Sequence, residues 1–339
     1  MNSDTLVPGD FFQNIWRGVT EPAVVYVERM GNTEYDGAGK SRVLNLAYIF
    51  FAFSKFLFIY YFVWFWNFIG SLKKFISIAY SFFFITPGLS AGVNSVIFWF
   101  MLFLIFSIIL KLFKSDIKRL KNVFFSLILL LLIGFYSFGN VMSQRGGGYG
   151  YFESSSPLGD IKVNVDDVDF LNFAELSILN SLQYTFVWVD FYLTQGYYGF
   201  SLILEDDFKW TYGFGNSVFL QRQLNLITGI DVGPLTYQRR NDAIWGENSM
   251  WHSFYGQFAN DYSPLGVIFL MFLIGFLMSK VWISYFYNNN FFAGSLLPII
   301  FIMVIFIPAN NQVFGYIDSL SYFIIVLLLY LKSKYKLSL

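Results

Sequence analysis

Seven stretches of the sequence are each close in length and polarity to a helix that crosses a lipid bilayer. Such a helix needs about 20 mostly apolar residues, and the stretches are 44–70, 75–90, 92–113, 122–141, 264–286, 291–309 and 317–331. Pro87, Gly88 and Ser90 suit a tight hairpin between the second and the third, although one long kinked helix is the alternative. Of the 339 residues, 56% are hydrophobic and only 13% are charged. We therefore predict an all-α polytopic membrane protein with about seven transmembrane helices.

The composition excludes several classes of protein and of site. A formal net charge of zero argues against a nucleic-acid partner. The chain has no cysteine, which excludes disulfides and thiolate metal sites, and its single histidine excludes the usual multi-histidine metal centres. The glycine-rich stretch RGGGYG at 145–150 lacks the Lys-Ser/Thr ending of a phosphate-binding P-loop. We therefore expect neither a metal nor another cofactor.

Basic residues near the ends of the predicted helices indicate how the chain is oriented. In membrane proteins, lysine and arginine near helix ends favour the cytoplasmic face. The residues concerned are Lys73, Lys74, Lys111, Lys114, Lys118, Arg119, Lys121, Lys280, Lys332, Lys334 and Lys336. Seven helices place all of these residues on one face, whereas one helix more or fewer would put some of them outside. The charge pattern therefore supports the count of seven.

This orientation divides the chain into four parts. Residues 1–42 form a segment on the outer face, 43–141 carry helices one to four, 142–263 form a large outer loop, and 264–339 carry helices five to seven with a cytoplasmic tail. The first part is a polar head without a visible signal peptide, so we expect upstream helices to be missing from this sequence. Within the loop, 169–204 predicts one or two helices lying in or dipping into the outer interface.

The outer loop is rich in aromatic side chains, and after Trp210 it predicts short amphipathic helices mixed with loop. Aromatic ring faces stack on sugars, while interleaved acids and amides hydrogen-bond sugar hydroxyls. The candidate sugar-binding residues are Trp210, Tyr237, Trp245, Glu247, Trp251 and Tyr255. The alternative is an aromatic belt at the membrane interface, which is a common use of Trp and Tyr.

Arginines in the same loop are candidates for binding a pyrophosphate at the level of the lipid headgroups. Guanidinium groups make bidentate hydrogen bonds to phosphate oxygens and keep their charge. The candidates are Arg145, Arg222, Arg239 and Arg240. The alternative is that they pair with the acids of the loop, where fourteen acidic residues outnumber six basic ones.

Three residues compete for the role of a general base on a sugar hydroxyl. His252 has a side chain whose ordinary pKa is about 6.5, and Asp261 and Glu247 are the other candidates. A structural role for a lone histidine is the alternative. Lys55 lies within the first predicted helix, where we expect its side chain to reach outward to the interface.

Two segments of the loop carry a resemblance to a known family. Several helices are followed by a large external loop that contains YLTQGYYGFSLILEDDFKWTYGFGNSVF (192–219) and ends in YGQFANDYSPLG (255–266) before an apolar helix. Over roughly 75–330 this arrangement resembles the bacterial oligosaccharide repeat-unit polymerases, the O-antigen or Wzy-type polymerases. One departure is Val93-Asn94-Ser95, where members of the family often carry a Gly-Arg pair.

The resemblance implies a GT-C-like fold, a place in the bacterial inner membrane with a periplasmic loop, and a role in lipopolysaccharide or capsule biosynthesis. The implied reaction is glycosyl transfer from an undecaprenyl-pyrophosphate-linked oligosaccharide to another lipid-linked repeat unit, without nucleotide or metal. Membrane lipids and a chain-length regulator protein are the implied partners. Two alternatives stay open: an O-antigen ligase, which resembles this chain in a histidine near the end of the loop (here His252), and a non-catalytic polysaccharide exporter.

Overall fold

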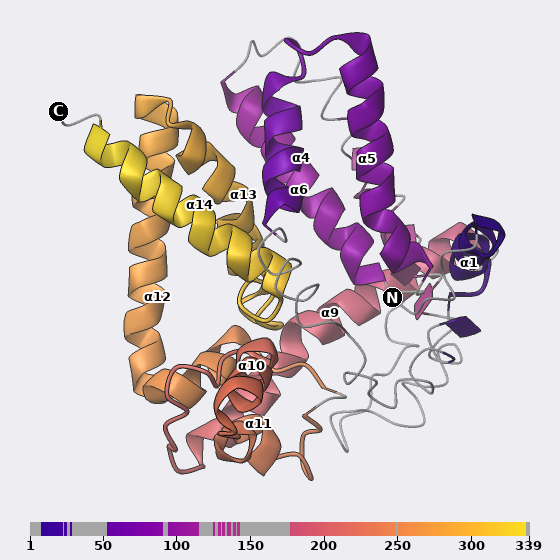
Figure 1. Ribbon diagram of the computed structural model, residues 1–339. Coiled ribbons are helices and arrows are strands. Elements are labelled where there is room, and N and C mark those ends of the chain that lie inside the picture. The colour runs from indigo at the N-terminus through magenta and orange to yellow at the C-terminus, as the bar shows by residue number, and fades with distance from the viewer. Residues whose placement is uncertain are drawn as a thin grey trace. The chain divides into compact units, whose positions relative to one another are not determined.

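The computed structural model (Figure 1) describes residues 8–22, 24, 25, 28, 53–90, 94–114, parts of 125–142, 177–247 and 250–336. These residues form eleven helices and no strand, in agreement with the predicted all-α class. The helices are α1 (Pro8–Thr20), α4 (Ser54–Phe65), α5 (Ser71–Leu89), α6 (Asn94–Phe113), α9 (Ser177–Leu204), α10 (Val218–Thr228), the 3-10 helix η5 (Gly233–Leu235), α11 (Tyr237–Arg240), α12 (Phe254–Asn288), α13 (Phe291–Phe306) and α14 (Ile317–Lys336).

Two compact units make up the chain. The first contains residues 1–41, 62–105 and 115–189, and the second contains 42–61, 106–114 and 190–339. Within the first unit, α1 contacts α5. The described candidate site residues all lie in the second unit.

Two of the described helices are long and apolar enough to cross a membrane. They are α6, through Val96–Phe113, and α12. The helices α4 and α13 are also apolar but have only 12 and 16 residues. Within the predicted helix over 122–141, the residues that the structure describes are helical, whereas residues 44–52 lie outside the described residues. The count of seven transmembrane helices therefore stays a prediction.

The stretches 75–90 and 92–113 form two separate helices, α5 and α6, rather than one long kinked helix. Pro87 and Gly88, which were expected in the connection between them, instead lie in the last turn of α5. The outer-loop stretch 169–204 contains one helix, α9, which continues for 28 residues to Leu204. Gly196 of this helix lies against the backbone of Ser253 and Pro308, and Gly199 lies against the side chain of Trp245.

The core of the second unit is formed by α12, α13 and α14, of which α13 packs against both of the others (Figure 1). Ten of the sixteen residues of α13 are buried, as expected for a helix that is apolar on all sides. Gly294 lets α13 approach the rings of Tyr60 and Tyr285, because a β-carbon at this position would overlap both side chains. The hydroxyl groups of Ser295 and Tyr322 lie 2.7 Å apart and join α13 to α14.

A break divides α12 into two helical parts. Ser263 has φ 60° and ψ 164°, which is not helical, and Pro264 follows it. Proline is well tolerated in the first turn of a helix, because its missing N–H would have no partner there. The apolar part of α12 therefore begins where the sequence predicts its fifth transmembrane helix. The preceding part, residues 254–262, is helical rather than irregular loop.

Lysines gather at one end of the second unit. Lys114 follows α6 and donates hydrogen bonds to the backbone oxygen of Tyr285 and to the side chain of Asn289, at the end of α12. Tyr330 of α14 donates to the backbone oxygen of Lys280. Lys332 belongs to the same final turns of α14. Lys114, Lys280 and Lys332 therefore lie toward the same end of α12, and the polar loop precedes α12 at its other end. The common cytoplasmic face of the lysines stays a prediction.

Candidate functional site

A single buried carboxylate organises the polar region that precedes the apolar part of α12. Asp261 is only 5% exposed. Its Oδ1 accepts hydrogen bonds from the hydroxyl of Thr211 and from the backbone N–H groups of Gly213 and Gly215, at 2.9 and 3.1 Å for the two glycines. Its Oδ2 accepts from the backbone N–H and the side-chain amide of Asn216, at 3.0 and 2.8 Å. With five hydrogen bonds on two oxygens, the carboxylate holds the turn 211–216 in place.

Asn260, the neighbour of Asp261, extends this network to a third segment. Its side-chain oxygen accepts from the backbone N–H of Tyr237 at 2.8 Å, where α11 begins. Its side-chain nitrogen donates to the backbone oxygen of Gly215 and to the side-chain oxygen of Gln238, at 3.0 and 2.7 Å. Residues 260 and 261 thus connect α12 to the turn 211–216 and to α11. This geometry favours a structural role for Asp261 over the expected role as a base.

The predicted arginines differ in how they are held. Arg240 lies beside Asp206, with 2.6 Å between guanidinium nitrogen and carboxylate oxygen, and also donates to the backbone oxygen of Asp207 at 2.7 Å. Its guanidinium lies over the ring of Tyr237, and its side chain is only 15% exposed. Arg240 is therefore part of the framework of the loop.

Arg239 is paired more loosely than its neighbour. It lies 2.9 Å from the carboxylate of Glu247, and its side chain is 56% exposed. The side chain of Glu247 is 17% exposed, so the pair lies at the surface with only the arginine open to solvent. Surface ion pairs contribute about 0–1 kcal/mol, and Arg239 makes fewer contacts to exchange than Arg240 does. Arg222 lies on the exposed side of α10, whereas Arg145 lies outside the described residues. The alternative that loop arginines pair with loop acids thus holds for Arg239 and Arg240.

His252 is buried, 6% exposed, in the segment that leads into α12. Its Nε2 has no hydrogen-bond partner among the described residues, and the imidazole is hydrogen-bonded to the backbone of Gly246. Burial lowers the pKa of His252 to about 4, although the Gly246 hydrogen bond and nearby Asp242 act in the opposite direction. The side chain is therefore neutral near pH 7, and a group with this pKa is a weak general base there.

The second half of α9 packs closely against the segment around His252. The backbone nitrogen of Trp251 donates to the side-chain oxygen of Gln195 at 3.2 Å. A β-carbon on Gly196 would overlap the backbone oxygen of Pro308 and lie 2.9 Å from the nitrogen of Ser253. These close contacts place α9 against both the 251–253 segment and the loop after α13.

The candidate sugar-binding aromatics fall into two groups. Trp245 and Tyr237 are each 1% exposed, and Trp245 donates from Nε1 to the backbone oxygen of Trp251 at 3.2 Å. Trp210 is 57% exposed beside Tyr212. Glu247, Trp251 and Tyr255 are partly exposed. The ring of Trp251 contacts that of Tyr192, and the ring of Tyr255 contacts those of Tyr197 and Phe200, all on α9. Trp245 and Tyr237 are thus part of the core, which leaves Trp210, Trp251 and Tyr255 with accessible ring surface.

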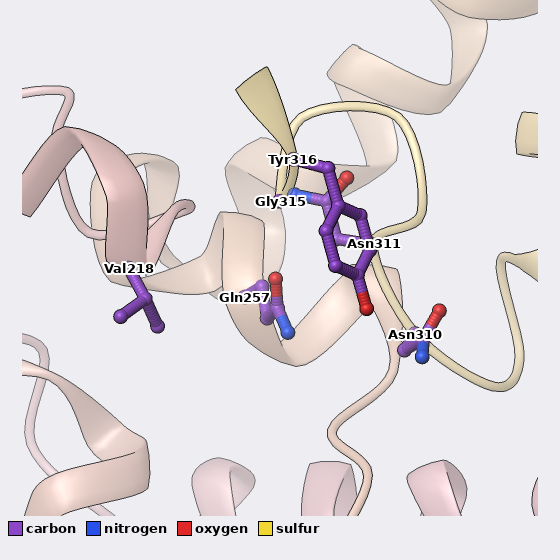
Figure 2. Close-up of a pocket in the computed structure, with 6 residues that line it drawn as sticks. All are labelled: Val218, Gln257, Asn310, Asn311, Gly315 and Tyr316. Carbon is purple, nitrogen blue, oxygen red and sulfur yellow. The ribbon is translucent and has the colours of Figure 1, made fainter. Parts of the chain in front are cut away.

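A cleft of about 220 Å³ lies beside this network, and the sequence did not point to its residues. It is lined by Val218, Gln257, Asn310, Asn311, Gly315 and Tyr316. Figure 2 shows the side-chain amides of Gln257 and Asn310 on either side of the Tyr316 hydroxyl. The cleft is therefore formed by α12, the first residue of α10 and the loop between α13 and α14.

The cleft and the Asp261 network share residues. Asn311 donates from its side-chain amide to the backbone oxygen of Asn216 at 2.8 Å and accepts from the N–H of Phe314 at 3.0 Å. Asn216 is in turn bound to Asp261. The signal that could have revealed the cleft is the run PANNQVFGY, 308–316, in which three consecutive amides follow an apolar helix.

The chain was compared with protein-family models, with curated proteins and with solved structures. None of the three comparisons gave a match. The described residues also contain no group of three or more His, Cys, Asp or Glu side chains arranged to hold a metal ion. The chemistry of the site must therefore be inferred from its own residues.

Proposed function

We propose that this protein is a glycosyltransferase of the bacterial inner membrane that polymerises lipid-linked oligosaccharide repeat units at the periplasmic face. Its donor would be an undecaprenyl-pyrophosphate-linked glycan, and its acceptor a second lipid-linked repeat unit. A chain-length regulator protein and the surrounding lipids would be its partners. The product would be O-antigen or capsule.

The observation that carries this proposal is the cleft, which is lined by amides and an aromatic ring beside the polar loop that precedes the apolar part of α12. Lysines near helix ends favour the cytoplasm, so the opposite end of α12, near Lys114 and Lys280, would face the cytoplasm and the cleft would face the periplasm. Amide side chains offer donors and acceptors together, as sugar hydroxyls do. Together with the exposed rings of Trp210 and Tyr316, the cleft suits a polyhydroxylated group carried on a lipid.

The reaction requires one bond to form and one to break. The acceptor hydroxyl oxygen would bond to the anomeric carbon of the donor glycan, while the bond from that carbon to the pyrophosphate oxygen breaks. The lipid pyrophosphate leaves with the bonding electrons, and a cation beside it stabilises the charge that develops. Arg239 is better placed than Arg240, because its guanidinium is largely exposed and its one ion pair, with the partly buried Glu247, is easier to exchange.

The proton of the acceptor hydroxyl must leave during the transfer. Both oxygens of Asp261 already accept hydrogen bonds from the turn 211–216, and His252 is buried with a low pKa. Glu247 remains as a partly exposed carboxylate. If Arg239 turned to the pyrophosphate, Glu247 would be released and could accept this proton.

Deletion of the gene in a host that makes a polymerised surface glycan tests the function. We expect the ladder of long chains to collapse to a single repeat unit on gels of the extracted glycan. Complete loss of surface glycan would instead support a ligase, and an unchanged ladder would refute both. Purified protein in lipid nanodiscs, supplied with an undecaprenyl-pyrophosphate-linked repeat unit, should form products of two or more units.

A matched pair of variants tests the role of Arg239. Arg239→Ala should reduce chain elongation by about 100-fold, because loss of one charged contact to the transition state costs a few kcal/mol. Asp231→Asn, which alters an exposed acid of the same loop, should leave elongation unchanged. Both proteins should be present in the membrane at the wild-type level. A normal ladder from Arg239→Ala would remove this arginine from the mechanism.

A further inference from the structure

We propose that the cleft lined by Gln257, Asn310, Asn311 and Tyr316 binds a single uncharged sugar ring and so selects repeat units with a neutral sugar at this position. The inference rests on the proposed function, because it names the chemical class of substrate at the polymerisation site. It assigns to the cleft a neutral sugar, bound without any of the arginines or carboxylates considered above.

The polar groups of the cleft match those of a sugar. Asn310 has a buried side-chain oxygen without a hydrogen-bond partner among the described residues. A buried acceptor without a partner is costly, and a hydroxyl donor from a ligand would satisfy it. The side-chain nitrogen of Gln257 makes only a long contact of 3.5 Å, to the backbone oxygen of His252. It can therefore turn to donate to a hydroxyl oxygen.

Tyr316 supplies the apolar part of the site. Its side chain is 51% exposed, and Figure 2 shows its ring above the space between Gln257 and Asn310. The CH-bearing face of a pyranose can lie against such a ring while its hydroxyls reach the amides. A ring beside paired amides distinguishes a sugar from a lipid tail, which would leave the amides without partners.

The size of the cleft limits what it can hold. Its volume of about 220 Å³ is below the roughly 300–1,000 Å³ of pockets that enclose drug-sized ligands. It therefore accommodates one ring rather than several, and the rest of the glycan would extend into solvent. Asn311 is already bound to Asn216 and Phe314, so it shapes the wall and leaves Asn310 and Gln257 to contact the sugar.

The lack of charge among the lining residues predicts which sugars the cleft prefers. None of the six lining residues is ionisable near pH 7, and amides alone compensate poorly for the desolvation of a carboxylate or a phosphate. A uronic acid or a phosphorylated sugar would lose its hydration without gaining a counter-charge. Neutral hexoses should therefore bind in preference to charged ones.

Saturation-transfer NMR on the full chain in nanodiscs tests this preference. The probes are the methyl glycosides of glucose, galactose and N-acetylglucosamine, with methyl glucuronide and glucose 6-phosphate as charged comparators. We expect transfer to at least one neutral glycoside and at least tenfold weaker binding of the charged sugars. No transfer to any neutral glycoside, or equal binding of the charged sugars, would overturn the proposal.

Variants locate the binding within the cleft. Asn310→Ala should weaken binding of the neutral glycoside by about tenfold, the effect of one lost hydrogen bond to a buried acceptor. Asn225→Ala, which removes an exposed amide on α10, should bind as wild type does. Equal affinity of Asn310→Ala and wild type would place the sugar elsewhere and refute the proposal.

The test of the cleft gives a result that can be distinguished from the test of the proposed function. If gene deletion collapses the glycan ladder while Asn310→Ala binds sugars normally, the polymerase proposal stands and the cleft proposal fails. If deletion leaves the ladder unchanged while Asn310→Ala loses sugar binding, the cleft is a sugar site in a protein of another function.

Discussion

Replacing Asp261 by asparagine exchanges one carboxylate oxygen for an amide nitrogen while keeping the size of the side chain. The carboxylate accepts five hydrogen bonds, three at Oδ1 and two at Oδ2. An amide offers only one acceptor oxygen. The less costly orientation keeps oxygen at the Oδ1 position and turns the amide nitrogen toward the two donors of Asn216. Donors would then face donors, and both hydrogen bonds would be lost.

The expected cost follows from these contacts. Hydrogen bonds to a charged group contribute about 1.5–3 kcal/mol each, so the loss of two should cost about 3–6 kcal/mol. Rotation of the Asn216 amide offers little relief, because its nitrogen also donates to the backbone oxygen of Gly213 at 3.1 Å. We therefore expect the turn 211–216 to open far more often in Asp261→Asn than in wild type.

Hydrogen exchange measured by mass spectrometry reports this opening directly. A cost of 3 kcal/mol corresponds to about 100-fold faster exchange, and the effect should fall on peptides that contain Gly213, Gly215 and Asn216. Peptides from α13 should be unchanged, because they lie in the core formed by the three long helices.

Asp231→Asn is the matched control. Asp231 is exposed, and its Oδ1 accepts one hydrogen bond, from the backbone N–H of Gly233 at 2.9 Å. An asparagine oxygen can accept the same bond, so this variant should exchange at the wild-type rate throughout 211–216. If Asp261→Asn also exchanges within about threefold of wild type there, the carboxylate does not hold the turn, and the description of the loop is wrong.

Two further predictions follow from the packing and the titration of the same region. Gly196→Ala should destabilise the protein by about 1–3 kcal/mol, because the added methyl group overpacks the contact between α9 and the 251–253 segment. Gly275→Ala should be neutral or slightly stabilising, because the space around Gly275 is open. Denaturation experiments measure both effects. Because the pKa of His252 is lowered to about 4, the folded state favours the neutral imidazole. The contribution of His252 to the free energy of unfolding is therefore complete above pH 6.5 and declines as the pH falls toward 4. Wild type should therefore lose about 2–3 kcal/mol more than His252→Gln between pH 7 and 4.5, and a greater loss by the variant would contradict the burial of the imidazole.

The apolar helices of the second unit could be predicted from the sequence because their signal is local. The predicted start at 264 coincides with the break at Ser263, and α14 begins at Ile317 as expected. Lysines at helix ends are likewise visible without knowledge of the fold. Lys114 and Lys280 both lie toward the C-terminal end of α12, but the shared cytoplasmic face stays a prediction.

The roles of the polar residues could not be predicted in the same way because their partners are distant in sequence. Asp261 meets the turn around Gly213 from 48 residues away, and Asn311 meets Asn216 from 95 residues away. Sequence patterns do not indicate which of many acidic side chains will accept hydrogen bonds from backbone N–H groups. Lys55 is a similar case: it was expected to reach outward to the interface, but it pairs with Asp318, 2.7 Å away, at the start of α14.

If the proposed function holds, exposed and buried side chains of the polar region would have different roles, in substrate binding and in the framework. A group that binds a moving substrate must be able to exchange its partner, and the energy of its present contacts decides whether it can. Arg240 would give up an ion pair, a backbone hydrogen bond and a ring contact, whereas Arg239 would give up one ion pair at the surface. The side-chain oxygen of Asn310 has no hydrogen-bond partner among the described residues that a ligand hydroxyl would have to replace. Arg239 and Asn310 are therefore the residues where a charged joint and a neutral sugar of one amphiphilic substrate would gain most on binding.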